Sequence, residues 1–234
     1  MKYLKDAQPA ISAAQADSRA SNAATQLQLL ELTQQLAALP AQTPPLQRAD
    51  LLLQSAHAAL TVEQNSEAWR FAEQAFALCL SQEAWEEAVQ ACDILFSADQ
   101  PGSLPALGQG IWLAVTFPID PELTAVMLEH LVEETPDDAD GGAVAAAAAC
   151  YVIDLRATEQ QRDNLMFFAN QLLGKVARRH GQVQTQAEFA AWITRLGLDH
   201  PEHFLGRLSL VIEVLVQDDW WFDRDELRAK LPIA

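Results

Sequence analysis

Four residues near the middle of the C-terminal half form the main concentration of positive charge in the sequence: Lys175, Arg178, Arg179 and His180. In a helix, Lys175 and Arg179 are one turn apart and share a face. Such a face could bind a carboxylate or a phosphate. Alternatively, these side chains offset the negative end of the helix dipole, at about 0.3–1 kcal/mol per charge. The sequence favours this second interpretation.

Two further segments resemble metal sites but have the wrong spacing. His200 and His203 are three residues apart, whereas a helical zinc motif needs histidines four apart. The acidic turn at 137–142 invites comparison with a calcium loop, but Gly142 and Ala149 occupy positions that require oxygen ligands. Helix capping by the aspartates explains this turn. We therefore expect no metal and no cofactor.

Nucleophilic and phosphate-binding motifs are also missing from the sequence. Cys79, Cys92 and Cys150 lie in apolar runs, where a thiol is expected to pack rather than react. Gly108 and Gly110 have no basic residue nearby, as a phosphate loop would require. We expect no catalytic residues, and the odd number of thiols favours a reducing, cytoplasmic location.

Negative charge is concentrated in one part of the chain, whose net charge is −17. Residues 67–140 contain fifteen Asp or Glu and one base, Arg70, and so carry −14. Such a field disfavours nucleic acid and attracts a basic protein partner. A solvated acidic face that keeps an Ala-rich chain in solution is the alternative. The predicted partner-binding acids are Glu83, Glu86, Glu87, Glu133, Glu134, Asp137 and Asp138.

A short internal echo occurs at residues 66–101. Glu67-Ala68-Trp69 is followed sixteen residues later by Glu83-Ala84-Trp85, and Ser81 between them is a candidate N-cap. We expect two antiparallel helices. This segment resembles one helical hairpin of the tetratricopeptide class, including a closing Pro101, although the preceding helix has Ala75-Phe76 in place of the family's small pair. The resemblance implies a non-catalytic, peptide-binding role.

Adjacent aromatic residues mark the C-terminal region, at Trp220-Trp221-Phe222. Because neighbouring side chains point in different directions, the rings could either hold the tail against the domain or anchor a partner. We include Trp220 and Trp221 among the candidate partner-binding residues.

Periodicity and composition predict an all-α fold, either a helical bundle or a short stack of antiparallel hairpins, with about nine helices. Residues 1–24 could form a flexible arm. Residues 25–234 then form one domain with a soft break near 99–105. Asp120-Pro121-Glu122 predicts a helix start, and 143–157 predicts the most buried helix. No run of residues is long and apolar enough for a membrane span, and the N-terminus does not resemble a secretory signal.

The leading hypothesis is a cytoplasmic, non-catalytic protein-binding module, such as an adaptor, assembly factor or specific chaperone, whose acidic face recruits a basic partner. A homo-oligomer is also compatible with the sequence. The alternative is a helical enzyme or enzyme subunit that binds an anionic small molecule near Arg178, Arg179 and His180.

Overall fold

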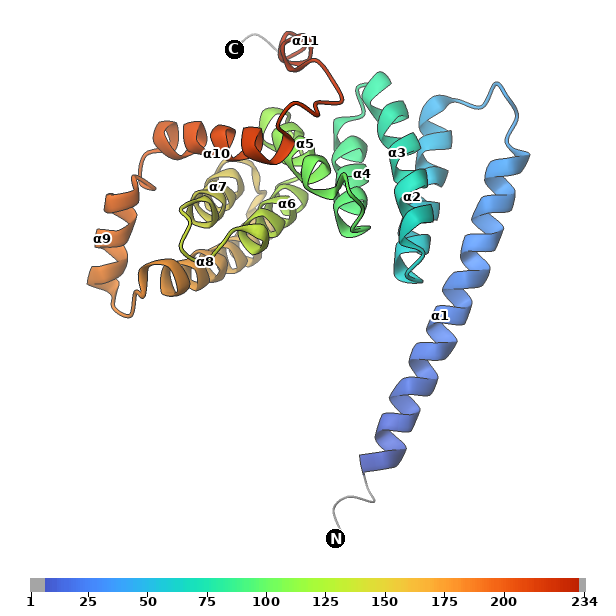
Figure 1. The fold of residues 1–234 in the computed structure, drawn as a ribbon, viewed down its shortest axis with the longest axis horizontal. Helices are drawn as coiled ribbons and strands as arrows, with labels where there is room; N and C mark the ends of the chain where they lie inside the picture. The colour runs from blue at the N-terminus through green and yellow to red at the C-terminus, as the bar shows by residue number, and fades with distance from the viewer. Residues whose placement is uncertain (1–6, 232–234) are drawn as a thin grey trace.

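The computed structural model describes residues 7–231, with side chains from residue 22 onward, and this part consists of helices and loops (Figure 1). The all-α prediction is confirmed. About nine helices were predicted, whereas the described residues contain eleven. The helices are α1 (Ala7–Ala38), α2 (Pro45–Thr61), α3 (Asn65–Ser81), α4 (Trp85–Ser97), α5 (Ser103–Thr116), α6 (Pro121–Glu134), α7 (Gly141–Arg156), α8 (Glu159–Gly181), α9 (Gln186–Leu196), α10 (Pro201–Val216) and α11 (Arg224–Arg228).

The first helix begins earlier than its apolar pattern predicts. The pattern starts at Thr25, but α1 begins at Ala7. Residues 1–6 lie outside the described residues, so the flexibility of the proposed arm stays a prediction. Leu29 and Leu32 are buried, and α1 packs against α2. The C-terminal part of α1 therefore belongs to the folded domain.

Two equivalent turns connect α2 to α3 and α3 to α4. Each contains three residues, and the middle residue, Glu63 or Glu83, has a positive φ of 59° or 57°. The amide of the next residue donates to the carbonyl five residues back, at 2.8 Å in the first turn and 3.0 Å in the second. This is a left-handed C-cap. The helices consequently start at residues 45, 65 and 85, a spacing of 20 residues.

This spacing corrects two details of the predicted hairpin. Trp69 lies inside α3, whereas Trp85 is the first residue of α4 and is equivalent to Asn65, so the sixteen-residue echo does not mark equivalent positions. Ser81 is not an N-cap. Its hydroxyl donates to a carbonyl within α3, and the residue before α4 is Ala84, which makes no side-chain cap. Backbone geometry, not a hydroxyl cap, forms this turn.

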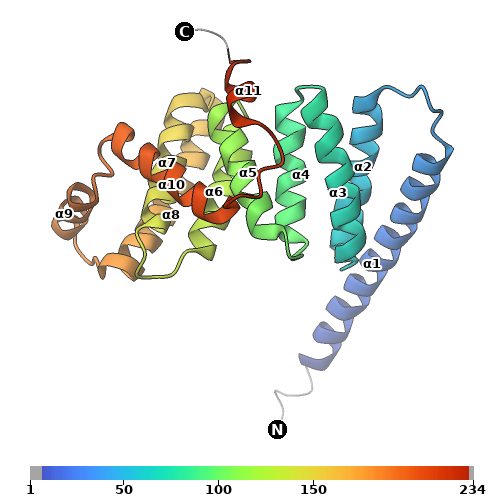
Figure 2. The same ribbon diagram turned by 45° about the horizontal axis from the view of Figure 1, so that its top comes forward.

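Successive helices pack as antiparallel hairpins in two layers. α2, α4, α6 and α8 contact one another in turn, and α3, α5 and α7 alternate with them on the other side. α10 packs across α5 and α7, and α9 lies at the end next to α8 (Figure 2). The layer of α3, α5 and α7 is therefore covered in part by C-terminal elements, whereas the layer of α2, α4, α6 and α8 is not covered by α10.

Helix α5 is packed closely by its neighbours through two glycines. A Cβ at Gly108 would lie 2.5 Å from the Val216 side chain of α10. A Cβ at Gly110 would lie 2.7 Å from Cβ of Cys92 on α4 and 2.5 Å from the Met127 methyl on α6. These two residues, unsuitable for a phosphate loop by sequence, allow three helices to approach α5.

Helix α7 contains a long buried run, but the prediction that it is the most buried helix is wrong: ten of its sixteen residues are buried, against ten of the fourteen in α5, because Asp154 and Leu155 at its C-terminal end are exposed. Every residue of 142–149 is buried. At its C-terminal end, Arg156 donates to the carbonyls of Ala114 at 2.7 Å and Val115 at 3.0 Å, which belong to the last turn of α5. Burial lowers the pKa of this guanidinium because it disfavours the charged form. Arg156 thus satisfies carbonyls that lack partners within α5.

The predicted start of α6 is confirmed, whereas the cap predicted for α7 is not. Asp120 accepts hydrogen bonds from the amides of Glu122 at 2.8 Å and Leu123 at 3.4 Å, and Pro121 is the first helical residue. Asp140 precedes α7 but makes no cap. Its carboxylate instead binds side chains of α8 and α10.

The chain after α10 folds back as a C-terminal strap, which comprises residues 217–231. Gln217 ends α10 with φ 54° and ψ −123°. The fully buried side chain of Gln109 on α5 holds the strap: it accepts from the amide of Trp221 at 2.8 Å and donates to the carbonyl of Asp219 at 3.4 Å. The strap is therefore fixed by a residue that lies far earlier in the chain.

Candidate functional site

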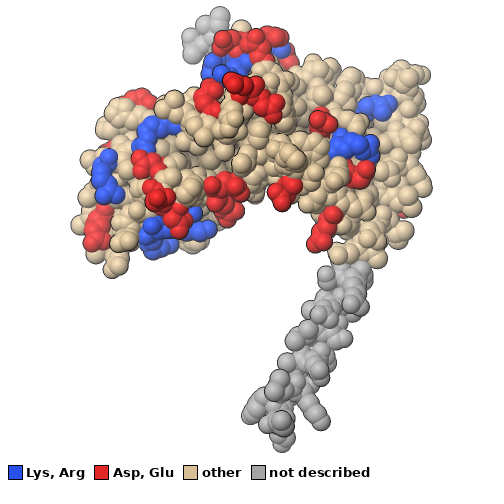
Figure 3. All heavy atoms as spheres, in the orientation of Figure 1, with Lys and Arg blue, Asp and Glu red and all other residues tan. Residues whose placement is uncertain are grey.

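The predicted basic cluster lies against the acidic turn between α6 and α7. Lys, Arg, Asp and Glu side chains are interspersed over the end of the molecule that holds α8 and α9 (Figure 3). Two ion pairs, Lys175–Glu133 at 3.9 Å and Arg179–Asp137 at 3.3 Å, join the cluster to the end of α6 and to the turn after it, and His180 forms a hydrogen bond of 3.0 Å with Asp140. Two sets of residues that the sequence suggested as separate binding sites thus partly neutralise each other.

Arg179 has a structural position at the end of α6. Its guanidinium donates to the carbonyls of Val132 at 2.6 Å and Thr135 at 3.4 Å. A Cβ at Gly142 would lie 2.8 Å from the same guanidinium, so glycine there makes room for it. Arg179 closes the last turn of α6 in the way that Arg156 closes α5.

His180 joins four elements through one hydrogen-bond network. Its Nδ1 accepts from the indole N–H of Trp192 at 3.0 Å, and an indole can only donate. The ring proton is therefore on Nε2, which donates to Asp140 at 3.0 Å. Arg207 donates to the other oxygen of Asp140 at 2.6 Å and to the carbonyl of Leu196 at 2.7 Å. The network holds α9 against α8, α10 and the α6–α7 turn.

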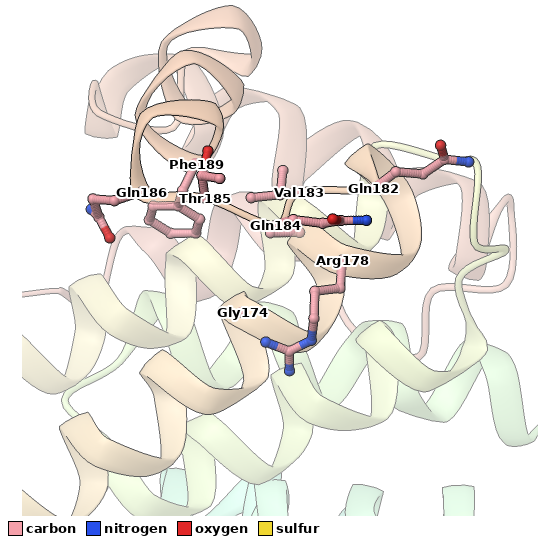
Figure 4. Close-up of a pocket in the computed structure, with 9 residues that line it drawn as sticks. Gly174, Arg178, Gln182, Val183, Gln184, Thr185, Gln186 and Phe189 are labelled. Carbon is pink, nitrogen blue, oxygen red and sulfur yellow. The ribbon is translucent and has the colours of Figure 1, made fainter.

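Arg178 is the member of the cluster that lines a hollow, of about 720 Å³, between α8 and α9 (Figure 4). Phe189 of α9 lies across from it, and the other lining side chains are neutral. Lys175, Arg179 and His180 do not line this hollow. Lys175 and Arg178 together line a second hollow of about 550 Å³, beside Glu129, and Arg179 and His180 line neither hollow. The four basic residues therefore do not converge on one ligand position.

The remaining predicted acids have different surroundings. Glu83 lies 3.1 Å from Lys230 of the strap. Glu86, Glu87, Glu134 and Asp138 are exposed and form no ion pair with the described residues. Glu86 and Glu87 lie in the first turn of α4, while Glu134 ends α6 and Asp138 follows it, so the predicted acidic residues do not form one continuous surface.

Trp220 and Trp221 are half-buried and belong to an aromatic cluster between the strap and the helices beneath it. The Trp221 ring is edge-on to Trp69 at 6.4 Å and to Phe76 at 5.4 Å, both on α3. The Trp220 ring lies 6.2 Å from Trp112 of α5. In this structure both rings hold the tail against the domain.

A groove of about 590 Å³ between α1, α2 and α4 is the better candidate for a binding site. We call it the acidic groove, because it contains three carboxylates, Asp50, Glu87 and Asp93, and no Lys or Arg. Its floor is apolar and buried. The floor residues are Leu53, Ala58 and Ile94, and the other lining residues are Thr25, Gln28, Gln54, His57, Thr61 and Gln90.

Of the three groove carboxylates, the sequence singled out Glu87 alone. Asp50, Gln54 and His57 recur at the i, i+4, i+7 spacing of one helical face, which is the signal that could have indicated a polar face on α2. Nothing in the sequence indicates that this face lies beside α4.

The groove carboxylates affect their surroundings. Burial, together with the charge of Glu87, raises the pKa of the Cys79 thiol to about 11. Burial and Asp93 raise the pKa of Cys92 as well. Asp93 also lies 2.9 Å from Nε2 of His130 on α6. Both thiols are buried and held in their neutral form, as expected for packing residues.

Among the described residues, no group of His, Cys, Asp or Glu has an arrangement that could hold a metal ion. None of the described helices combines the length and apolarity needed to cross a membrane. Comparisons of the chain with models of protein families, with curated proteins and with solved structures found no match.

Proposed function

We propose that this chain is a non-catalytic helical module, an adaptor, assembly factor or specific chaperone, that binds another protein through the acidic groove. The observation that carries the proposal is the composition of the groove: Asp50, Glu87 and Asp93 surround an apolar floor with no Lys or Arg in the lining. A segment that presents Lys or Arg beside apolar side chains complements both features.

The acids predicted from the sequence have different roles, depending on whether they are already in an ion pair. Glu86 and Glu87 on α4, with Glu134 and Asp138 further away, attract and orient a basic partner over a distance of about 8–10 Å at physiological salt. Acids already paired, such as Glu83 and Asp137, contribute less to this field. Burial of apolar atoms on the groove floor would supply most of the affinity.

The hairpin arrangement is consistent with the peptide-binding role that the tetratricopeptide resemblance implies. The exposed faces of α2 and α4 lie in the layer that the C-terminal elements do not cover. The groove is formed by these two helices with α1 as its third wall. An extended or helical peptide could therefore reach it without rearrangement of the fold.

The alternative, an enzyme that binds an anionic small molecule near Arg178, Arg179 and His180, has less support. It requires the basic residues to converge on one cavity. Arg178 lines the α8–α9 hollow, but Arg179 binds carbonyls at the end of α6, and His180 binds Trp192 and Asp140. A ligand at the hollow would thus meet one positive charge.

The proposal is tested by reversing the charge of the groove. The double variant Asp50→Lys/Glu87→Lys and the wild type are each used to capture partners, which are identified by quantitative mass spectrometry. We expect the variant to lose a specific basic partner. With that partner purified, association should be slowed at least about tenfold at low salt, and the two proteins should converge as salt rises.

A matched control carries the same change of charge elsewhere. Glu159→Lys/Asp163→Lys alters two exposed acids on α8, away from the groove. This control should bind the partner as the wild type does. Equal loss of binding by both double variants would show that net charge, not the groove, determines binding. Equal binding by all three proteins would show that the partner does not occupy the groove.

A further inference from the structure

The C-terminal strap is a self-contained segment with its own set of contacts on α3, α4 and α5. Trp221 packs against Trp69 and Phe76, and Phe222 lies 5.3 Å from Trp112. The final part of the strap adds an ion pair, from Lys230 to Glu83 at 3.1 Å, and buries Leu227. On the strap side, all these contacts are made by residues that follow Gln217. The strap could therefore make them with its own chain or with the same surface on a second copy of the chain.

Two features make the strap less stable in its present position than its contacts alone would suggest. Gln217 combines φ 54° with ψ −123°, a backbone conformation that non-glycine residues rarely adopt. The indole N–H of Trp220 is buried and has no hydrogen-bond partner among the described residues. Straightening the chain at Gln217 would remove the first of these penalties.

The helix that leads into this bend has an uncovered apolar face. Leu210 is 66% exposed and Val214 is 71% exposed, and they lie one turn apart on α10, within two turns of Gln217. Covering large, exposed apolar side chains with another surface lowers the free energy, because apolar area is removed from water. Their position beside the bend is where a second copy of α10 would lie if two chains exchanged straps.

We propose that this chain forms a homodimer in which each strap crosses to the partner copy and occupies the surface formed by α3, α4 and α5 there. The exchanged strap would make the same contacts that it makes within one chain. Only the backbone at Gln217 would change, and the two α10 helices would meet through Leu210 and Val214. Short, strained connections favour exchange of this kind. This proposal does not depend on the acidic groove, which is lined by other residues.

The first test measures molar mass by light scattering, over protein concentrations up to about 500 µM, because the dimer fraction rises with concentration. We expect the wild type to reach the mass of a dimer. Leu210→Ser/Val214→Ser should remain a monomer, whereas Leu155→Ser/Phe167→Ser, which changes two other exposed apolar residues, should not alter the dimer fraction. A wild type that is a monomer at every concentration would overturn the proposal.

A substitution at the bend, Gln217→Gly, provides a second test, with a predicted decrease of the association constant. Gln217→Gly relieves the strain without removing a contact, because glycine tolerates positive φ. It stabilises the strap within its own chain, so the association constant should fall by about tenfold. An unchanged or higher association constant would contradict the role assigned to Gln217.

Complementation distinguishes exchange from ordinary dimerisation. Gln109→Ala impairs the surface that receives the strap, and Trp221→Ala impairs the strap. Mixed together, these variants can form a heterodimer in which one intact strap meets one intact surface. Native mass spectrometry should therefore show a heterodimer fraction well above the half that random pairing of equal amounts would give. A statistical mixture of dimers, or monomers alone, would exclude strap exchange.

Discussion

Replacing Gly110 by alanine tests how closely α5 approaches α4 and α6. A methyl group at this position would lie 2.7 Å from Cβ of Cys92 and 2.5 Å from the terminal methyl of Met127. Contacts below 3.0 Å require a neighbour to move. Met127 can move its flexible end, but Cβ of Cys92 is fixed to the backbone of α4. The helices themselves must therefore separate.

Two opposing effects set the size of the change. Overpacking of a core costs about 1–3 kcal/mol, and the upper part of this range applies because rigid atoms are involved. Alanine has a higher helix propensity than glycine by about 1 kcal/mol, which offsets part of the loss. The expected net effect is a loss of about 2 kcal/mol of stability, or a Tm lower by about 4–8 °C for a domain of this size.

Gly206 on α10 provides the matched control. It is also a helical glycine, but a methyl group there would meet no neighbouring atom within 4 Å beyond the backbone of its own helix. Gly206→Ala should gain about 1 kcal/mol from helix propensity alone. Urea unfolding followed by circular dichroism measures both variants under the same conditions. The identical chemical change should thus shift the midpoint in opposite directions at the two positions.

The opposite signs are the decisive result. If Gly110→Ala were as stable as the wild type or more stable, α5 could not pack against α4 and α6 at the distances described. If Gly206→Ala were destabilising by a similar amount, the effect of Gly110→Ala would reflect something other than crowding.

Three further predictions concern the end of α5, the start of α9 and the thiols. Arg156→Leu removes the donors that satisfy the carbonyls of Ala114 and Val115. Urea denaturation should show a free energy of unfolding lower by about 2–3 kcal/mol, with little recovery in Arg156→Lys. Hydrogen bonds from the amides of Gln184 and Thr185 lower the pKa of Glu188 from its ordinary 4.5. The wild type should therefore be more stable than Glu188→Ala above pH 4.5, and this difference should disappear as the pH falls through the lowered pKa. Urea midpoints measured across this pH range test the prediction. Native protein at about pH 8 should react slowly with a thiol reagent in a colorimetric assay, because burial raises the pKa of its free thiols, and rapid reaction of Cys92 would contradict the described core.

Helix boundaries were predictable where a local signal fixes the backbone. Asp120-Pro121-Glu122 combines a cap, a residue with preset φ and an acid in the first turn, and α6 begins there. Ser81 was misleading because a hydroxyl cap is one of several ways to start a helix. At the turn before α4 a glutamate, Glu83, adopts the left-handed conformation that glycine usually provides. Side-chain identity did not indicate that geometry.

The candidate sites depend on which helical faces meet, and periodicity does not determine this. Lys175 and Arg179 were correctly placed on one face of a helix, but the sequence did not indicate that the acidic turn after α6 lies opposite them. Asp50 and Asp93 belong to different helices and come together only through the packing of α2 on α4. Gln109 and Trp221 are separated by 112 residues, and no motif links them.

The repeated turn geometry at Glu63 and Glu83 has a consequence for how this part of the molecule could change in length. Each turn rotates the following helix by the same operation, because its backbone conformation and its five-residue hydrogen bond are the same. Residues 45–84 therefore behave as a modular segment: duplicating or deleting it would leave the helices on either side in equivalent orientations, and the stack would grow or shorten along its own axis.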